Sequence, residues 1–203
     1  MEADELSSVK MLGLKLPTDP RWVNIAEKTI DEILTDHAYC EQKATTNCIS
    51  LVVRYPEYED MVDEVTAVAA EEWGHFRKVL KELKKRGYKL GRTRNDNYVV
   101  KLRDFKLKGD SRLKGFIDEL LIAAMIEARS CERFRLLSLH VNDDELKKFY
   151  HEFMVSEAGH YTLFIDLAKK YIDSEYVKKR WEEYLNYEAE LIQTIEYRGD
   201  RVH

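Results

Sequence analysis

The four-residue stretches Glu-Trp-Gly-His at 72–75 and Glu-Ala-Gly-His at 157–160 decide the fold of this 203-residue chain. Each stretch lies in a run of residues with helical periodicity, and its carboxylate and imidazole are three residues apart. On an α-helix that spacing brings both side chains to one face, about one turn apart. One Glu-x-x-His is weak evidence, because Glu and His are ordinary surface residues. Two copies, each preceded by a helix with a carboxylate on its apolar face, indicate a di-metal site in a four-helix bundle.

The composition favours one all-helical domain over residues 1–203. The chain has only three Pro and eight Gly, and 35% of its residues are charged, which is typical of long helices. No run of about 18 apolar residues occurs, so we expect no membrane span. The first 17 residues lack the basic-then-apolar order of a secretory signal. Three cysteines without metal-type spacing indicate reduced thiols, as in a cytoplasmic protein.

Helical periodicity predicts five helices, four of which form the bundle. They are expected at residues 20–55, 57–86, 112–140, 144–171 and 175–198. Residues 1–17 are expected to form an N-terminal arm and residues 199–203 a loose tail. Residues 88–111 are a long connection without a clean period, and a crossover that lets the third helix run parallel to the second explains its length. The predicted class is all-α, a four-helix bundle with this crossover and an additional C-terminal helix.

The distance of each carboxylate from its turn selects four ligands. Antiparallel helices joined by a short turn bring residues equidistant from that turn to one level. Glu41 and Glu127 each lie 13 residues before their turn, and Glu72 and Glu157 each lie 14 residues after it. Glu132 lies eight residues before its turn, which is about 7 Å too near at 1.5 Å per residue. We therefore predict Glu127 and not Glu132 as the fourth carboxylate.

Four carboxylates and two imidazoles at one level suit a pair of divalent first-row metal ions. The predicted ligands are Glu41, Glu72, His75, Glu127, Glu157 and His160. Oxygen and nitrogen donors without thiolate favour iron or manganese over a structural zinc. Glu71 could replace Glu72 in another register, but it faces about 100° away on the helix. A metal-free helical interaction module, in which the six residues form buried ion pairs, is the alternative from the same residues.

A basic segment follows the first Glu-x-x-His. Residues 77–114 contain fifteen Lys and Arg against four Asp and Glu, although the whole chain has a net charge of −5. Such a local excess can neutralise phosphates, and a nearby aromatic ring can stack on a base. Tyr88 and Tyr98 are the candidate stacking residues, and a merely solvated face is the alternative. The candidate RNA-binding residues are Lys84, Lys85, Arg86, Lys89, Arg92 and Arg94.

The sequence around the four carboxylates resembles one enzyme family. The motifs are DHAYCEQKA around Glu41, EEWGHF around Glu72, IEARSCERF around Glu127 and SEAGHY around Glu157. They resemble the tRNA hydroxylases of the MiaE type, within the ferritin-like di-iron carboxylate superfamily. The resemblance extends over about residues 16–198, and EARSCERF is its most specific part.

The resemblance implies a ferritin-like bundle, a reaction and a cofactor. The implied reaction is O2-dependent hydroxylation of the isopentenyl group of 2-methylthio-isopentenyladenosine beside the tRNA anticodon. The implied cofactor is two iron ions, with manganese less expected, held by the six predicted ligands. The implied partners are tRNA, not DNA, and an external electron donor. No G-x-G-x-x-G fingerprint of a bound flavin or nucleotide occurs among the eight Gly.

Other functions and supporting residues remain open from the sequence. A ferritin-like oxidase or peroxidase, an iron-handling protein without an RNA substrate, or a hydroxylase of another prenylated compound fits the same ligands. Asp36 and Asp166 are candidates to accept the second N–H of a metal-bound His. His37 lies one turn from Glu41, where it could support that ligand or only pack. Cys131 is expected to fill space as a small apolar residue.

Overall fold

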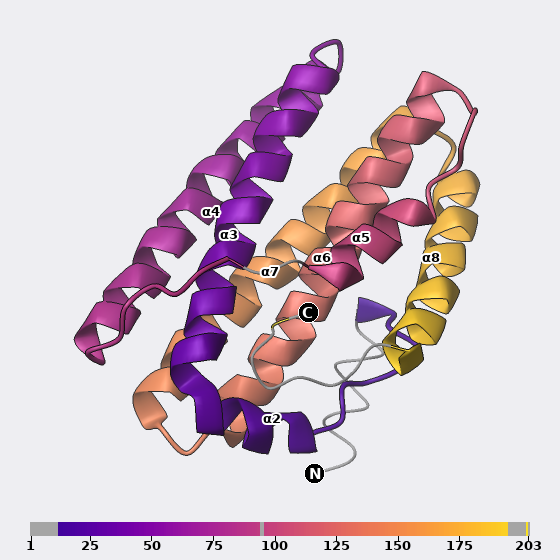
Figure 1. Ribbon diagram of the computed structural model, residues 1–203. Helices are drawn as coiled ribbons and strands as arrows, with labels where there is room; N and C mark the ends of the chain where they lie inside the picture. Colours follow the sequence, from indigo (N-terminus) through magenta and orange to yellow (C-terminus); the bar gives the residue numbers. More distant parts are fainter. Residues whose placement is uncertain (1–11, 94–95, 195–201, 203) are drawn as a thin grey trace. The chain divides into compact units, whose positions relative to one another are not determined.

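The computed structural model describes residues 12–93, 96–194 and 202, and these residues form helices and loops without a strand (Figure 1). The helical elements are α2 (Arg21–Ala26), the 3₁₀ helix η1 (Glu27–Thr29), α3 (Ile30–Arg54), α4 (Glu59–Lys85), α5 (Asn97–Asp104), α6 (Arg112–His140), α7 (Asp144–Tyr171) and α8 (Ser174–Thr194). The predicted all-helical class is thereby confirmed. Within the described ranges, no helix combines the length and the apolar character needed to cross a membrane.

The described residues belong to two compact units. The α3–α4 unit comprises residues 24–93 and Val202, and the α6–α7 unit comprises residues 12–23 and 96–194. Each unit contains one long antiparallel helical hairpin (Figure 1). The expectation of one domain over residues 1–203 stays a prediction.

In the α3–α4 unit, α3 and α4 pack along their length through apolar side chains at helical spacing. The buried apolar residues are Ile33, Leu34, Ala38, Cys48 and Leu51 on α3, and Met61, Val65, Val68, Val79 and Leu83 on α4. Tyr55 ends α3 as predicted, with its N–H bonded to the carbonyl of Leu51 at 2.9 Å, because the following Pro56 disfavours further helix. These contacts fix the position of α3 relative to α4 along the helix axes. They therefore determine which polar residues of the two helices lie side by side.

The end of α4 is set by Gly87, which directly follows the predicted helical range 57–86. Its φ is +76°, a conformation that favours glycine. The N–H of Gly87 bonds to the carbonyl of Lys84 at 3.0 Å, and that of Tyr88 to the carbonyl of Leu83 at 2.9 Å. This pair of bonds is a Schellman motif. The chain then returns to α3, where the Tyr39 hydroxyl donates to the carbonyl of Gly91 at 2.9 Å.

Two predictions at the ends of the chain need correction. The first helix was expected to be continuous over residues 20–55, but it begins at Arg21 and is interrupted by η1 before α3. Asp19 accepts a hydrogen bond from the N–H of Arg21 at 2.9 Å, which fixes this start. Of the tail at residues 199–203, which was expected to be loose, only Val202 is described; it is fully buried and donates its N–H to Asp36 at 2.8 Å. The last predicted helical residues, 195–198, lie outside the described part of the chain.

In the α6–α7 unit, α6 is the central element. It begins at Arg112 as predicted, because the side chain of Ser111 accepts a hydrogen bond from the N–H of Lys114. Most of its residues from Phe116 to Leu137 are buried, as expected for a helix packed on several sides. α7 follows after a short turn and is capped by Asp143, which accepts from the N–H groups of Glu145 and Leu146.

The connection at residues 88–111 contains a helix, α5, that was not predicted. Asp96 caps α5 by accepting from the N–H of Val99 at 3.1 Å, and Tyr98 and Leu102 are buried where α5 packs against α6 and α8. The proposal of Tyr98 as a stacking residue for RNA is therefore wrong. Its ring is 4% exposed and its hydroxyl donates to Glu188 at 3.2 Å.

Candidate metal centre

Three predicted ligands of the α3–α4 unit lie together. One donor atom each of Glu41, Glu72 and His75 lies within 4.8 Å of the others. Nδ1 of His75 is 3.5 Å from a carboxylate oxygen of Glu41 and 3.5 Å from one of Glu72. Both carboxylates are at most 4% exposed. Glu41 on α3 and Glu72 on α4 thus lie at one level along the two helices, as their distances from the turn predicted.

Two members of this set, Glu41 and His75, each contact a further polar group. The imidazole of His37 is fully buried, and its Nε2 lies 2.7 Å from the second carboxylate oxygen of Glu41. His37 therefore holds the Glu41 carboxylate from the side opposite His75. Nε2 of His75 lies 3.8 Å from the carboxylate of Glu71, which is half exposed. Glu71 thus lies near the outer nitrogen of His75 rather than replacing Glu72.

The α6–α7 unit holds the second set. One donor atom each of Glu127, Glu157 and His160 lies within 4.8 Å of the others. Nδ1 of His160 is 4.0 Å from a carboxylate oxygen of Glu157. All three side chains are buried, at 3–5% exposure. Both sets therefore consist of two carboxylates and one imidazole whose Nδ1 faces the acids.

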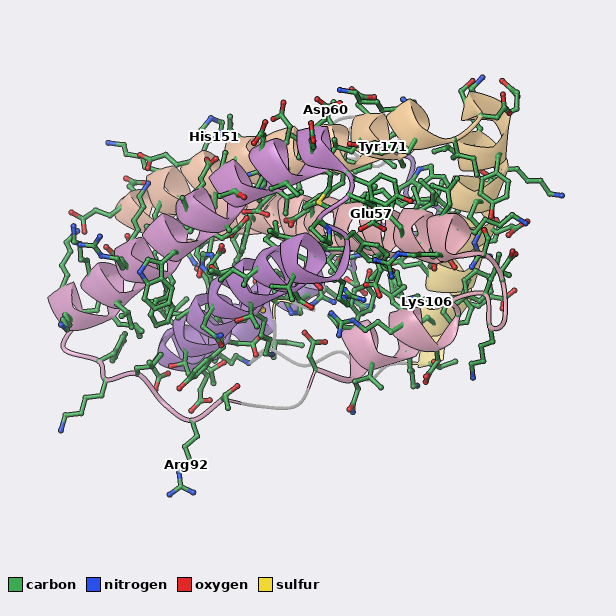
Figure 2. All side chains as sticks on the ribbon, turned by 90° about the horizontal axis from the view of Figure 1, so that it is seen from above. Glu57, Asp60, Arg92, Lys106, His151 and Tyr171 are labelled. Atoms are coloured by element: carbon green, nitrogen blue, oxygen red, sulfur yellow. The ribbon has the colours of Figure 1, made fainter. Side chains whose placement is uncertain are left out.

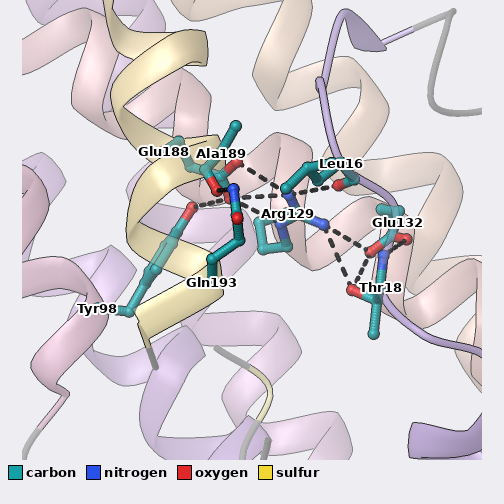
Figure 3. A network of polar contacts seen from close by, with 8 residues as sticks. All are labelled: Leu16, Thr18, Tyr98, Arg129, Glu132, Glu188, Ala189 and Gln193. Carbon is teal, nitrogen blue, oxygen red and sulfur yellow. Dashed lines mark hydrogen bonds and ion pairs between the residues drawn. The ribbon is translucent and has the colours of Figure 1, made fainter. Parts of the chain in front are cut away.

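Glu132 belongs to a different cluster, which Figure 3 shows around Arg129. Its carboxylate accepts from the N–H of Thr18 at 2.8 Å, from the Thr18 hydroxyl at 2.6 Å and from Arg129 at 3.1 Å. Arg129 also donates twice to Glu188, at 2.9 and 3.0 Å, and once to the carbonyl of Leu16 at 3.0 Å. Glu132 thus anchors the segment before α2 to α6, and its carboxylate is fully engaged there.

The charges in this cluster compensate each other. Burial acts to lower the pKa of Arg129, but the charges of Glu132 and Glu188 outweigh it and raise the pKa above its usual value. Burial raises the pKa of Glu188, and the neighbouring Arg129 opposes that shift. Arg129 therefore stays a cation between two acids. The cluster is structural, because each of these acids is paired with Arg129.

The remaining candidates near the ligands have separate roles. The side chain of Asp166 is 63% exposed and pairs with Lys169 at 3.0 Å. Asp36 is buried and accepts the N–H of Val202. Cys131 donates to the carbonyl of Met154 at 3.3 Å. Burial, aided by the charges of nearby acids on α6, raises the pKa of its thiol to about 12, so it stays protonated and fills space as predicted.

The predicted RNA-binding residues lie at and beyond the C-terminal end of α4. Lys84, Lys85, Lys89 and Arg92 are exposed, and Arg86 is half buried in an ion pair with Glu82 at 2.6 Å. Figure 2 shows the side chain of Arg92 pointing away from the protein. The sixth candidate, Arg94, lies outside the described residues.

The two ligand sets fit divalent metal ions by their donor chemistry. Carboxylate oxygens and imidazole nitrogens are common ligands of first-row metals, and thiolates are absent from both sets. Two donors bound to one ion at 2.0–2.2 Å would stand about 3–4 Å apart, close to the separations around His75. Two buried carboxylates so close together are costly without a compensating cation.

Comparison with known proteins identifies relatives over nearly the whole chain. A family model described as tRNA-(MS[2]IO[6]A)-hydroxylase (MiaE) matches residues 5–203. A Pseudomonas putida protein named tRNA 2-(methylsulfanyl)-N(6)-isopentenyladenosine(37) hydroxylase is 36% identical over 181 residues, which cover 89% of this chain and 87% of that protein. The Salmonella typhimurium protein of the same name is 26% identical over 241 residues, covering 95% and 88%.

A solved structure with a similar fold carries a different description. It is described as protein 43 with aldehyde deformylating oxygenase activity from Synechococcus, and it is 32% identical in sequence. The TM-score is 0.87, and the match covers 94% of each chain. This similarity over the whole length supports the predicted ferritin-like class.

Proposed function

Because this chain belongs to the MiaE family of tRNA hydroxylases, we propose that it hydroxylates the isopentenyl group of 2-methylthio-isopentenyladenosine in tRNA at a centre of two iron ions. The family makes the chain an enzyme, an oxidoreductase. O2 would be the oxidant, and an external donor would supply the electrons. We assign the reaction to the cytoplasm, where tRNA is modified.

The proposed ligands are Glu41, Glu72 and His75 from the α3–α4 unit, and Glu127, Glu157 and His160 from the α6–α7 unit. The observation that carries this assignment is that each unit gathers two carboxylates and one imidazole, with donor atoms within 4.8 Å. The two sets have the same composition and a similar sequence spacing, as expected if each contributes half of one centre. Iron is preferred to manganese because the family and the reaction with O2 point to it.

The chain's own groups would hold, orient and shield the metals. Four carboxylates would balance the charge of two divalent ions. His37, at 2.7 Å from Glu41, would fix the orientation of that ligand, as groups around metal ligands commonly do. Side-chain acids and bases cannot break an unactivated C–H bond, so the metals with O2 would supply that chemistry.

The test is incubation of the iron-loaded chain with O2, a reductant and tRNA that lacks the hydroxyl group, followed by mass analysis of the nucleosides. We expect one oxygen atom to be added to the prenyl group. Glu157→Ala should abolish the product. Asp166→Asn is the matched control, because Asp166 lies on the same helix but is exposed and paired with Lys169. An unchanged nucleoside with the fully loaded wild-type chain would refute the proposal.

The similarity to the Synechococcus protein supports a second candidate, an oxygenase that acts on an aldehyde. The same preparation incubated with a long-chain aldehyde in place of tRNA tests it. Loss of the aldehyde without any change in tRNA would favour this function over the first.

A further inference from the structure

We propose that Trp73 and Phe76 on α4 form a stacking platform for an unpaired base of the tRNA loop, and that the basic C-terminal half of α4 binds the phosphates next to it. This inference rests on the proposed function and names the surface that would present the substrate. It concerns the α3–α4 unit alone.

The exposed Trp73 and the half-buried Phe76 form an aromatic pair. Their centroids are 4.9 Å apart and their planes are inclined by 27°, so they are stacked. The indole of Trp73 is 47% exposed, although burial of so large an apolar group would be favourable. By contrast, Trp22 is 1% exposed. A stacked and half-exposed indole is well suited to receive a further flat ring.

The position of Trp73 on α4 connects this surface to the candidate metal centre. It directly follows Glu72 and precedes His75 by two residues, so all three lie within one helical turn. Trp73 points to a different side of the helix, as its exposure shows against the 1% of Glu72. A base stacked on Trp73 would therefore lie at the level of the proposed ligands without displacing them.

The charge of α4 changes sign at Trp73. Residues 57–72 contain seven Asp and Glu and no Lys or Arg, whereas residues 73–86 contain six Lys and Arg and one Glu. That Glu, Glu82, is paired with Arg86 at 2.6 Å and with Lys85 at 3.9 Å. Figure 2 places Glu57 and Asp60 at the acidic end of the helix. Phosphates would be attracted by one half of α4 and repelled by the other.

Two of the basic residues lie on the same face of α4 as the indole of Trp73. Arg77 lies four residues and Lys84 eleven residues after Trp73, and both spacings return to nearly the same side of the helix. Along the axis they are about 6 Å and 16 Å from Trp73. Beyond the end of α4, the Schellman turn at Gly87 and the Tyr39–Gly91 hydrogen bond hold the backbone that carries Lys89 and Arg92.

An RNA loop is the occupant that this combination fits best. Sequence-tolerant binding of unpaired nucleotides combines aromatic stacking with cations that follow the backbone. Chemistry on a base of a folded RNA also requires that the base leaves its stack. The platform would receive such a base, and the acidic half of α4 would stop the strand from running further toward Glu57.

The test uses two fluorescent anticodon stem-loop RNAs and the iron-loaded full chain. One RNA carries the prenylated adenosine, and the other has an abasic nucleotide at that position. Trp73→Ala should weaken binding of the first RNA by about 5- to 100-fold, the range for loss of one stacked base. It should weaken binding of the abasic RNA less than twofold. Trp73→Phe should restore most of the affinity, and Val155→Ala, which alters an exposed apolar residue on α7, should have no effect.

Charge variants keep the inference testable if Trp73→Ala loses iron or stability. Arg77→Gln and Lys84→Gln should each reduce the salt dependence of binding, by roughly 0.7 in the slope of log affinity against log salt. Equal losses of affinity by Trp73→Ala for both RNAs, or wild-type affinity in both tests, would overturn the platform. So would a loss confined to Tyr88→Ala, because the stacking residue would then lie beyond α4. If the wild-type chain hydroxylates tRNA in these cases, only the platform fails; if it does not, the proposed function fails.

Discussion

Replacing Glu132 by Ala should destabilise the protein and leave its metal content unchanged. Replacing Glu127 by Ala should instead remove bound metal without destabilising the metal-free protein. Glu132 accepts three hydrogen bonds, from the N–H and hydroxyl of Thr18 and from Arg129, at 2.6–3.1 Å. Breaking a buried ion pair by removing one partner costs about 3–5 kcal/mol. Arg129 keeps Glu188 at 2.8 Å, so we expect the lower end of that range, about 3 kcal/mol.

For a chain of 203 residues this loss corresponds to a fall in Tm of about 6–12 °C. Thermal unfolding measures it, and elemental analysis of the reconstituted proteins measures iron. Glu127→Ala should lose iron, but its metal-free form should be as stable as the metal-free wild type or more so, because one of the crowded buried acids is gone. Loss of iron with Glu132→Ala and full occupancy with Glu127→Ala would refute the assignment of the fourth carboxylate.

Three further predictions follow from the described contacts. His37→Phe should lower iron affinity about 10- to 100-fold by freeing the Glu41 carboxylate, which a metal titration measures; unchanged affinity would show that His37 only packs. The raised pKa of Cys131, about 12, means that near pH 8 only about one thiol in ten thousand is ionised. Alkylation followed by mass spectrometry should therefore show that Cys131 is modified more slowly than the half-buried Cys40, and that the rate at Cys131 falls as the pH is lowered. Equal rates of modification at pH 8 would contradict this. Chelation of the iron should lower Tm by about 5–11 °C, the loss expected when a ligand at 100 times its Kd is removed, and ferrous salt should restore it; a Tm insensitive to metal would count against a buried centre.

The sequence was sufficient to predict the structure at positions where a local signal, such as a capping residue, agrees with the pattern of buried residues. Ser111 and Asp143 cap α6 and α7 where a polar residue precedes an apolar period, and Gly87 ends α4 where only a positive φ continues the chain. The level of Glu127 followed from counting residues along rigid helices of known rise. These features depend on neighbours along the chain, so a single sequence reveals them.

The parts that were missed depend on residues far apart in the chain. Nothing near Arg129 indicates that Glu188 and the carbonyl of Leu16 bind it. α5 had a local signal, the cap Asp96 followed by apolar residues at helical spacing, but the surrounding Lys and Arg obscured it. The same basic composition suggested that Tyr98 faces RNA, while its burial is decided by contacts with α8.

The exposed Trp73 was overlooked for a related reason. Trp73 lies inside the Glu-x-x-His motif, where an aromatic residue is expected to pack in the core. Only its exposure and its stack on Phe76 distinguish it from a core residue. Exposure of one side chain on an amphipathic helix depends on which other elements cover that face, and the sequence does not specify this.

The most direct test of the central claim is the magnetic state and stoichiometry of the bound iron. If Glu41, Glu72 and His75 form one centre with Glu127, Glu157 and His160, the chain should bind two iron ions whose oxidised forms are magnetically coupled, as Mössbauer spectroscopy would show. Ala at Glu72 or at Glu157 should then disturb both ions. Two uncoupled ions that are lost independently, or a chain that binds no iron, would contradict the account.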